Sequence, residues 1–183
     1  TGKIAKISPT DPPIMIPGIK ADGSFYPIEK IEAHVKGQHH LAVSAFIFDG
    51  EEMLIQRRAP GKYHCGDQWA NTCCTHPHWD EDPKAAVLRR LQEELGLFQV
   101  PVEERLVVEY SADVGNGLWE KERVHMFRAN ISKDEIELNL NPDEVSATRW
   151  VDAQTLQSEI AVSPEQFTPW FRIYLNRYPT LDF

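Results

Sequence analysis

The segment DPKAAVLRRLQEELGL, residues 82–97, indicates the fold of this chain most directly. Asp82 is suited to cap a helix, Pro83 to its first turn and Gly96 to its C-terminal end. Apolar residues recur along the segment at the spacing of one helical face: Val87, Leu88, Leu91 and Leu95. The segment therefore predicts an amphipathic helix that buries one face.

Strand patterns lie on both sides of this helix. Residues 41–59 predict two strands joined at an Asp49-Gly50 turn, and residues 68–74 predict a further strand or the end of one. The other expected elements are a strand pair at 105–114 and 119–129, around Gly115-Asn116-Gly117, and two helices at 152–160 and 165–177. Strands that precede, flank and follow helices are typical of a single mixed α/β domain.

The N-terminal part of the chain differs in composition from the rest. Residues 1–24 are rich in proline and glycine, which predicts an irregular lead-in, followed by one folded domain over residues 25–183. Because the lead-in ends close to Lys30 and His34, we hypothesise that it closes over a binding site when substrate binds.

Composition limits the classes of partner. The chain has 183 residues and a formal net charge of −9, which argues against nucleic acid as the main partner. It contains no apolar run long enough to cross a membrane. The three cysteines are odd in number, and Cys73 and Cys74 are adjacent, which disfavours a disulfide between them. We therefore expect reduced thiols in a cytoplasmic enzyme.

The helical segment also resembles part of a known motif. From Thr75 to Leu97 the sequence is similar to the Nudix box, G-x5-E-x7-R-E-U-x-E-E-x-G-U, in which U is apolar. The matching positions are Glu81, Arg89, Leu91, Glu93, Glu94 and Gly96. Two positions differ, because Thr75 replaces the first glycine and Arg90 replaces a glutamate. The resemblance implies a Nudix-type mixed β-sheet sandwiched between helices. The cation at Arg90 argues against the metal-dependent hydrolysis typical of that superfamily.

Three histidines and two glutamates form a second candidate group. Glu120 and Glu122 are two residues apart in a predicted strand, so their side chains point to the same side. Together with His34, His40 and His76 they would form a mixed nitrogen and oxygen site, suited to zinc, manganese or iron. The alternative is a solvated strand face with unrelated histidines. Spacing alone leaves both interpretations open.

Taken together, these motifs resemble type I isopentenyl diphosphate isomerase, a Nudix-fold enzyme that isomerises its substrate. The resemblance runs from "IEKIEAH" to "FTPWFR" and is most specific in "HHLAVSAFIF", "LIQRRAPGKYH", "WANTCCTHP", "RRLQEELGL" and "GLWEKERVHMF". It implies interconversion of isopentenyl and dimethylallyl diphosphate by proton addition and removal, through a tertiary carbocation.

The resemblance implies roles for individual residues. Cys74 and Glu122 would be the acid/base pair on opposite faces of the substrate. Tyr110 would hydrogen-bond the Glu122 carboxylate, and Trp170 would face the carbocation. One divalent ion (Zn, Mn or Mg) would bind a set of five residues: His34, His40, His76, Glu120 and Glu122. His39 is the alternative to His40, which we prefer because "HLAV" matches the family's strand start.

The resemblance also implies a cradle for an anionic substrate. Lys30, Arg58, Lys62 and Arg90 occupy basic positions of the family, and a magnesium ion would bridge the diphosphate to Glu94. The expected partner is a small-molecule diphosphate, without nucleic acid or membrane, and the chain would be a monomer or weak homodimer.

Two rival functions share parts of this pattern. A Nudix pyrophosphohydrolase acting on a nucleoside or related diphosphate would need neither Cys74 nor Arg90. In a non-catalytic metal-binding module, the histidines and glutamates would only hold the fold. Two buried thiols packing a strand end is a further interpretation of Cys73 and Cys74, and we favour it for Cys73 alone.

Overall fold

A computed structural model describes residues 13–182 and contains a nine-stranded mixed sheet within that range. The strands are β1 (Met15–Ile19), β2 (Phe25–Glu29), β3 (His39–Asp49), β4 (Glu52–Arg58), β5 (Trp69–Ala70), β6 (Cys73–Thr75), β7 (Glu103–Gly115), β8 (Leu118–Asn130) and β9 (Val145–Asp152). The α-helices are α1 (Lys30–Lys36), α2 (Pro83–Leu95), α3 (Ala153–Val162) and α4 (Pro169–Arg177), and the short 3-10 turns are η1 (Lys133–Glu135) and η2 (Pro164–Gln166).

Strand β3 is the centre of the sheet. It pairs in parallel with β8 from His39 to Phe48, and antiparallel with β1, β4 and β6. Strand β7 continues the sheet beyond β8 as an antiparallel hairpin, and β9 pairs with β4. The sheet is therefore mixed in direction, as the sequence predicted.

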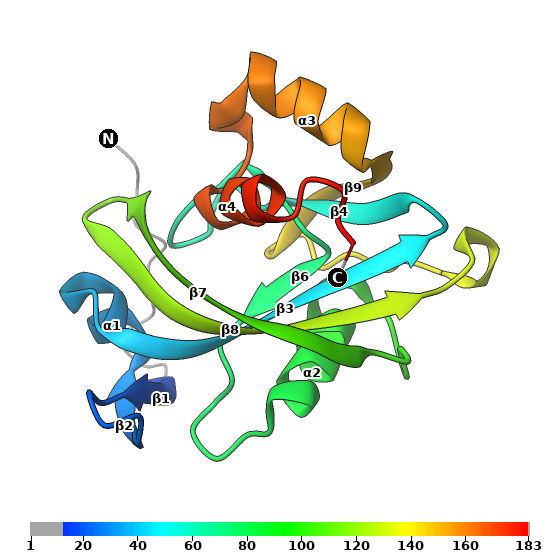
Figure 1. The fold of residues 1–183 in the computed structure, drawn as a ribbon. Coiled ribbons are helices and arrows are strands. Elements are labelled where there is room, and N and C mark those ends of the chain that lie inside the picture. The colour runs from blue at the N-terminus through cyan, green and yellow to red at the C-terminus, as the bar shows by residue number, and fades with distance from the viewer. Residues whose placement is uncertain (1–12, 183) are drawn as a thin grey trace.

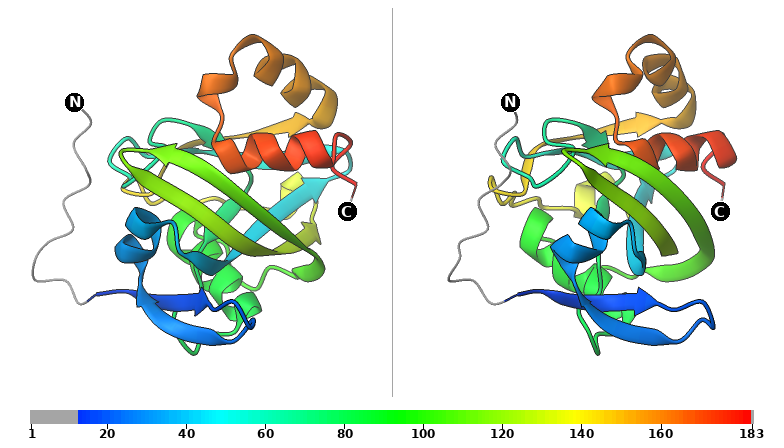
Figure 2. Two further views of the ribbon diagram at one scale, coloured as in Figure 1. Left: turned by 60° about the vertical axis from the view of Figure 1, so that its left-hand side comes forward. Right: turned by 90° about the vertical axis from the view of Figure 1, so that its left-hand side faces the viewer.

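Helices cover both faces of this sheet, and the alternation along β3 explains why (Figure 1). Val43, Ala45 and Ile47 pack with the apolar face of α2. Phe46 and Phe48, on the opposite face, pack with α3 and α4. Because successive side chains of a strand point to opposite faces, one strand buried on both sides supports two cores. Figure 2 shows the same layers from two other sides. This arrangement confirms the predicted fold class.

The predicted amphipathic helix is confirmed as α2, with the expected ends. The Asp82 side chain accepts a hydrogen bond from the Ala85 N–H, and Pro83 lies in the first turn. Gly96 ends the helix with φ of 68°, a left-handed conformation that favours glycine. The turns at Gly50 and at residues 115–117 also join strand pairs as predicted.

The N-terminal part is more ordered than expected. Residues 15–19 of the predicted irregular lead-in form β1, which pairs with β2 along its length and with β3 at Gly18 and His40. Pro17 did not prevent this, because a proline is tolerated in a short strand near the sheet edge. The first 12 residues of the proposed lid lie outside the described residues. Ile14 lines the cavity discussed below.

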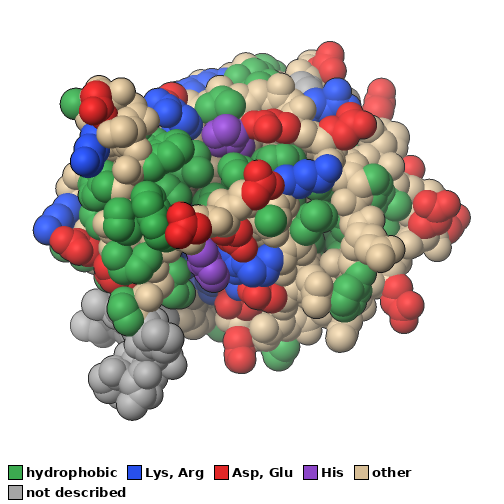
Figure 3. All heavy atoms as spheres, turned by 90° about the horizontal axis from the view of Figure 1, so that it is seen from below, with side chains coloured by type: hydrophobic (Ala, Val, Ile, Leu, Met, Phe, Trp, Pro, Cys, Tyr) green, Lys and Arg blue, Asp and Glu red, His purple; other side chains and the backbone are tan. Residues whose placement is uncertain are grey.

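The molecular surface is uneven. Seen from below, hydrophobic side chains gather on the left, beside a mixed group of acidic and basic side chains (Figure 3). Exposed large hydrophobic residues around the N-terminal hairpin include Ile14, Met15 and Phe25. Among residues 13–182, no helix has both the length and the apolar character needed to cross a membrane.

Candidate active site

A cavity of about 320 Å³ opens beside β3 and collects most of the predicted site residues. Its wall includes Lys30, Arg58, Lys62, Cys74, His76, Arg90, Tyr110, Glu120, Glu122 and Trp170. These residues are far apart in the sequence and come from helices, strands and the loop between β4 and β5. The fold therefore brings together candidates that sequence spacing could not connect.

Strand register places the reactive side chains. His40 on β3 lies opposite Glu122 on β8, and Glu122 lies opposite Tyr110 on β7. On the other side of β3, Ser44 lies opposite Cys74 on β6. Because residues two or four apart along a strand share a face, His40 and Ser44 both face the α4 side of the sheet. Cys74 and Glu122 therefore line one cavity from strands on opposite sides of β3.

The predicted imidazoles and carboxylates form one buried cluster. His76 Nε2 lies 2.8 Å and His40 Nε2 3.2 Å from Glu122 Oε2, and His34 Nε2 lies 3.7 Å from Glu120 Oε1. The His34 and His40 rings are fully buried. The resemblance left His39 as an alternative, but its Nε2 instead lies 2.8 Å from Glu109 Oε2, outside the cluster.

The hydrogen bonds of two histidines leave a ring nitrogen free toward the cluster. Nδ1 of His34 donates to the Lys30 carbonyl and Nδ1 of His40 to the Gln38 carbonyl, each over 2.7 Å. A carbonyl oxygen only accepts, so Nδ1 carries a proton in each ring, and in a neutral imidazole Nε2 then keeps its lone pair. Both Nε2 atoms are buried without a hydrogen-bond partner. Such nitrogens beside carboxylates fit a divalent cation.

The two carboxylates of the cluster titrate differently. Burial and the negative charge of Glu120 raise the pKa of Glu122 to about 8. Burial also acts to raise the pKa of Glu120, but the His64 and His34 imidazoles outweigh it and hold that pKa well below the usual range. The Tyr110 hydroxyl donates to either carboxylate. One proton and one negative charge are thus held between two acids, which suits a site that later accepts a cation.

Cys74 is a half-buried, protonated thiol surrounded by polar groups. Its S–H donates to Asn71 Oδ1 over 2.9 Å, and Ser44 Oγ lies 3.3 Å from the sulfur. The Trp170 indole N–H donates to the same sulfur over 3.1 Å. Burial raises the pKa of Cys74 to about 12, so the thiol is neutral at physiological pH. A neutral thiol with stabilising donors beside it can act as an acid.

Trp170 is a wall of the cavity as well as a core residue. It is 2% exposed and packs with the α4 face of the sheet. The Arg58 guanidinium carbon lies 5.2 Å from its ring centroid, within the range of a cation–π contact. Its ring therefore already faces positive charge.

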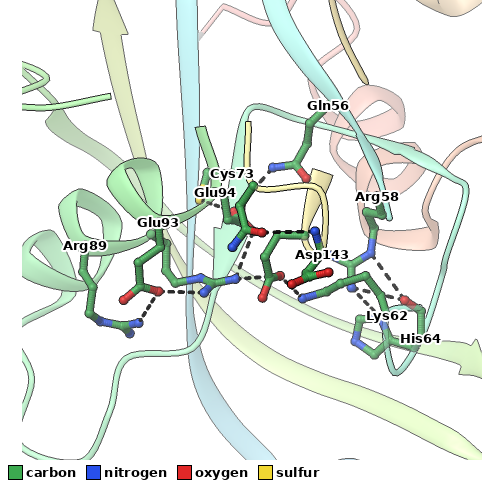
Figure 4. A network of polar contacts seen from close by, with 12 residues as sticks. Gln56, Arg58, Lys62, His64, Cys73, Arg89, Glu93, Glu94 and Asp143 are labelled. Carbon is green, nitrogen blue, oxygen red and sulfur yellow. Dashed lines mark hydrogen bonds and ion pairs between the residues drawn. The ribbon is translucent and has the colours of Figure 1, made fainter. Parts of the chain in front are cut away.

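The basic residues form a separate group, in which Lys62 and Arg90 are ion-paired with Glu144. Glu144 Oε2 accepts from Lys62 and, over 2.9 Å, from Arg90 Nη2. Burial, followed by the positive charges of Lys62 and Arg90, lowers the pKa of Lys30 to about 7. Figure 4 shows this network between Glu93 and Glu94 on the helix side and Arg58, Lys62 and His64 on the loop side. We call Lys30, Arg58, Lys62 and Arg90 the cationic cradle.

Glu94 occupies a different position from the other predicted metal ligands. It is 2% exposed, and its carboxylate contacts Arg90 Nη2 at 3.2 Å and the Cys73 thiol at 3.1 Å. Among the described residues, the groups able to hold a metal contain no acid from α2. Arg90, which replaces a glutamate of the Nudix box, is thus paired with Glu93 and Glu94, whereas Glu81 is paired with Arg89.

Sequence reasoning missed several residues of the site. Glu144 neutralises two cations of the cradle, and Asn71 and Ser44 contact the Cys74 sulfur. His64 Nε2 lies 2.8 Å from Glu120 Oε1. Asn71 and His64 stand inside the segments that carried the resemblance, close to Cys74 and Lys62, so their position in the sequence could have identified them.

Comparison with known proteins agrees with this geometry. The NUDIX domain model matches residues 38–171. A curated isopentenyl-diphosphate Delta-isomerase from Cereibacter sphaeroides is 51% identical over 157 residues, which cover 86% of this chain and 88% of that protein. Another, from Jannaschia sp., is 48% identical over 162 residues, covering 88% and 92%.

Solved structures reproduce the fold. DR0079 from Deinococcus radiodurans superposes with a TM-score of 0.70 and 15% identity, covering 89% of this chain and 98% of that one. A MutT protein from Methanosarcina mazei has a TM-score of 0.60 and 18% identity, covering 76% and 92%. At these identities the likeness concerns the fold alone.

Proposed function

This chain belongs to the isopentenyl-diphosphate Delta-isomerase family and carries a NUDIX domain, and from that premise we propose how its residues perform the reaction. The protein is an isomerase of isoprenoid biosynthesis, interconverting isopentenyl and dimethylallyl diphosphate. The observation that carries the proposal is that a neutral thiol, Cys74, and a carboxylate, Glu122, line one cavity from strands on opposite sides of β3.

The chemistry requires an acid and a base that act on one substrate. Moving the isolated double bond of isopentenyl diphosphate adds a proton to the terminal carbon of that bond. Another proton is removed from the CH₂ group on the other side of the tertiary carbon. The first step leaves a tertiary carbocation. The site must therefore exclude water and stabilise positive charge while both protons move.

Cys74 supplies the first proton. Its thiol is neutral because burial raises its pKa to about 12, so it reaches the substrate in the protonated form. Proton loss leaves a thiolate, which the Trp170 N–H and the Ser44 hydroxyl stabilise by hydrogen bonds. The Trp170 ring would face the carbocation, where the π-face of an aromatic ring contributes about 2 kcal/mol when the charge is desolvated.

Glu122 removes the second proton. Five residues would hold one divalent ion: His34, His40, His76, Glu120 and Glu122. When bound, the ion would balance the paired carboxylates and keep Glu122 ionised. The Tyr110 hydroxyl, which contacts Glu122, orients this carboxylate toward the substrate and relays its proton. Three imidazoles among the donors favour zinc or manganese over magnesium in this site.

The cationic cradle binds the diphosphate. Arg58 and Arg90 offer planar forks suited to phosphate oxygens, and Lys30 and Lys62 add positive charge beside them. Glu94 would be the residue that holds a magnesium ion accompanying the diphosphate, and the ion would neutralise phosphate charge. In this structure the Glu94 carboxylate is paired with Arg90 at 3.2 Å.

The pairing of the Nudix-box acids favours isomerisation over hydrolysis. A Nudix hydrolase would use the carboxylates of α2 to hold cations, but Arg90 contacts both Glu93 and Glu94. The cavity is also lined by the Cys74 thiol, for which hydrolysis has no use. We infer that α2, the helix of the Nudix-like segment, keeps its structural role. Arg90 makes the acidic face of this helix suitable for binding phosphate.

The proposal also covers the partner, the cellular compartment and the oligomeric state. The partner is a small-molecule diphosphate. Three free thiols, Cys65, Cys73 and Cys74, suit a reducing compartment, and we propose the cytoplasm. A monomer or weak homodimer, without nucleic acid or membrane, stays our prediction.

The direct test uses solvent deuterium. The purified protein is incubated with isopentenyl diphosphate and divalent metal in heavy water, and the products are followed by proton NMR. We expect deuterium in dimethylallyl diphosphate, with turnover lowered at least about 10³-fold in Cys74→Ala and in Glu122→Gln.

Cys73→Ala is the matched control, because this neighbouring thiol faces Glu94 on the other side of β6. It should keep most of the wild-type turnover. Full activity in Cys74→Ala would remove the acid from our scheme. Release of inorganic phosphate from nucleoside diphosphates, without isomerisation, would instead support the hydrolase.

A further inference from the structure

His64 is a buried histidine to which the reaction scheme above gives no role. It lies in the loop between β4 and β5, two residues after Lys62 of the cationic cradle, and is 2% exposed. Its ring lies edge-on to Trp170, with centroids 5.4 Å apart, and 5.6 Å from the His34 ring. The loop therefore brings one imidazole to the boundary between the cationic cradle and the cluster of imidazoles and carboxylates.

The Nε2 atom of His64 is directed into that cluster. It lies 2.8 Å from Glu120 Oε1, yet it is buried and has no partner with hydrogen-bond geometry. One ligand atom each from His64, His34 and Glu120 lie within 4.8 Å of one another. A buried imidazole nitrogen without a partner, beside a carboxylate oxygen and a second imidazole, has the surroundings of a metal ligand.

The other ring nitrogen is compatible with ligation. A neutral imidazole that binds a metal through Nε2 carries its proton on Nδ1. Arg58 Nη2 lies 3.4 Å from His64 Nδ1 but closer, 3.1 Å, to the His64 carbonyl, which also accepts from Arg58 Nε over 3.4 Å. Arg58 can therefore hold the loop through the carbonyl alone, leaving Nδ1 free to carry the proton.

We propose that His64 is a further ligand of the divalent ion, supplying a fourth imidazole beside His34, His40 and His76. This inference rests on the metal site proposed above and adds a residue outside the ligand set that the family resemblance implied. Four imidazoles and two carboxylates make a donor set richer in nitrogen, which shifts its preference further from magnesium toward zinc and other transition metals.

A ligand on this loop would also connect the two halves of the cavity. Arg58, Lys62 and His64 lie within seven residues, so an ion held by His64 fixes the backbone that carries two cations of the cradle. Metal binding would therefore order the diphosphate site. Because linkage between two binding sites is reciprocal, diphosphate binding would in turn strengthen metal binding.

The test observes ligation directly, without using catalysis. Protein labelled with ¹⁵N at histidine is loaded with ¹¹³Cd²⁺, and one-bond coupling between the two nuclei identifies each ligating nitrogen. We expect coupling at Nε2 of His64 and at one nitrogen each of His34, His40 and His76. His64→Gln assigns the signal and should weaken cadmium binding by at least about 10- to 100-fold.

His39→Gln is the matched control. His39 Nε2 also lies 2.8 Å from a carboxylate oxygen, on Glu109, and also lacks a hydrogen-bond partner, but it belongs to no group of possible ligands within residues 13–182. This variant should keep all four couplings. A His64 Nε2 that carries a proton and shows no cadmium coupling, while the other three histidines are coupled, would overturn our proposal and leave the proposed metal site intact. Absence of cadmium coupling at all four histidines would overturn both the role of His64 and the proposed metal site.

Discussion

The cluster of imidazoles and carboxylates and the cationic cradle adjoin the same cavity, but they stabilise buried charge in opposite ways. In the cradle, Lys62 and Arg90 both bond Glu144, and Arg90 also pairs with Glu94. In the cluster, two carboxylates lie among imidazoles, and several ring nitrogens have no hydrogen-bond partner. A buried charge is stable only when it is matched. Lys62 and Arg90 of the cradle are matched within the folded chain, whereas Glu122 in the cluster keeps a proton, which a bound cation would replace.

This difference has a consequence for binding. A cation would replace the proton that Glu122 holds and the 2.8 Å contact between His76 Nε2 and Glu122 Oε2, and it would gain the attraction of both carboxylates. A diphosphate must compete with Glu144 for Lys62 and Arg90. We therefore expect tight metal binding and weaker, more adjustable diphosphate binding.

Metal removal should give the largest effect, because it leaves the cluster unmatched. Without the ion, the raised pKa of about 8 keeps Glu122 protonated at neutral pH, so it cannot act as a base. We expect chelation to lower isomerisation by at least about 10²- to 10⁴-fold, and zinc or manganese to restore it. Saturating metal should also stabilise the fold, by about 2.7 kcal/mol at 100 times Kd. Turnover measures the loss of isomerisation and thermal unfolding measures the gain in stability, each with the metal content determined. An active metal-free protein would show that the cluster does not need a cation.

Removing Arg90 should have the next largest effect, confined to the cradle. Charge-assisted hydrogen bonds contribute about 1.5–3 kcal/mol each, so Arg90→Gln should weaken pyrophosphate binding on the order of 10- to 100-fold. Titration calorimetry with inorganic pyrophosphate measures this. Arg57→Ala is the control, because Arg57 is half exposed and pairs with Asp67 outside the cavity. Equal losses in the two variants would mean that the cradle attracts the anion only by its net charge.

The pH dependence of stability should reveal the unmatched acid. In the metal-free protein, Glu122 holds its proton up to about pH 8, whereas in the unfolded chain it ionises near its usual value. The unfolded state therefore binds fewer protons over this range, and stability falls as pH rises, by at most about 1.4 kcal/mol per unit.

Denaturant unfolding of the wild type and Glu122→Gln at several pH values isolates this effect, since other titrating groups largely cancel in the difference. The wild type should lose stability relative to the variant as pH rises toward 8. Saturating metal should abolish the difference in slope. Parallel profiles without metal would show that Glu122 is ionised in the folded chain.

Relieving the competition in the cradle should give the smallest effect, in the favourable direction. Glu144→Gln removes the negative charge that neutralises Lys62 and Arg90 and should tighten pyrophosphate binding on the order of five- to tenfold, about 1 kcal/mol. Calorimetry without added metal measures this change. Weaker binding would mean that Glu144 holds the two cations in position for the anion, so that its pairing assists rather than competes.

Local patterns predicted a large part of the fold, since these elements depend on neighbouring residues. Helix α2 followed from its caps and apolar spacing, and the two hairpins from their glycine turns. Helix α1 and strand β1 escaped detection. Helix α1 is only seven residues long, and β1 contains a proline and a glycine, so their order comes from packing within the fold.

The sequence by itself determined the chemistry that this chain can offer: a thiol two residues before a histidine, two acids two residues apart and an arginine in a Nudix-type helix. Only the tertiary structure showed that His39 lies beside Glu109, outside the cluster, that Glu144 pairs with Lys62 and Arg90 and that His64 approaches Glu120. Spacing along the chain sets which side chains share a face. Pairing register and loop course, which depend on the whole packed fold, set what that face meets.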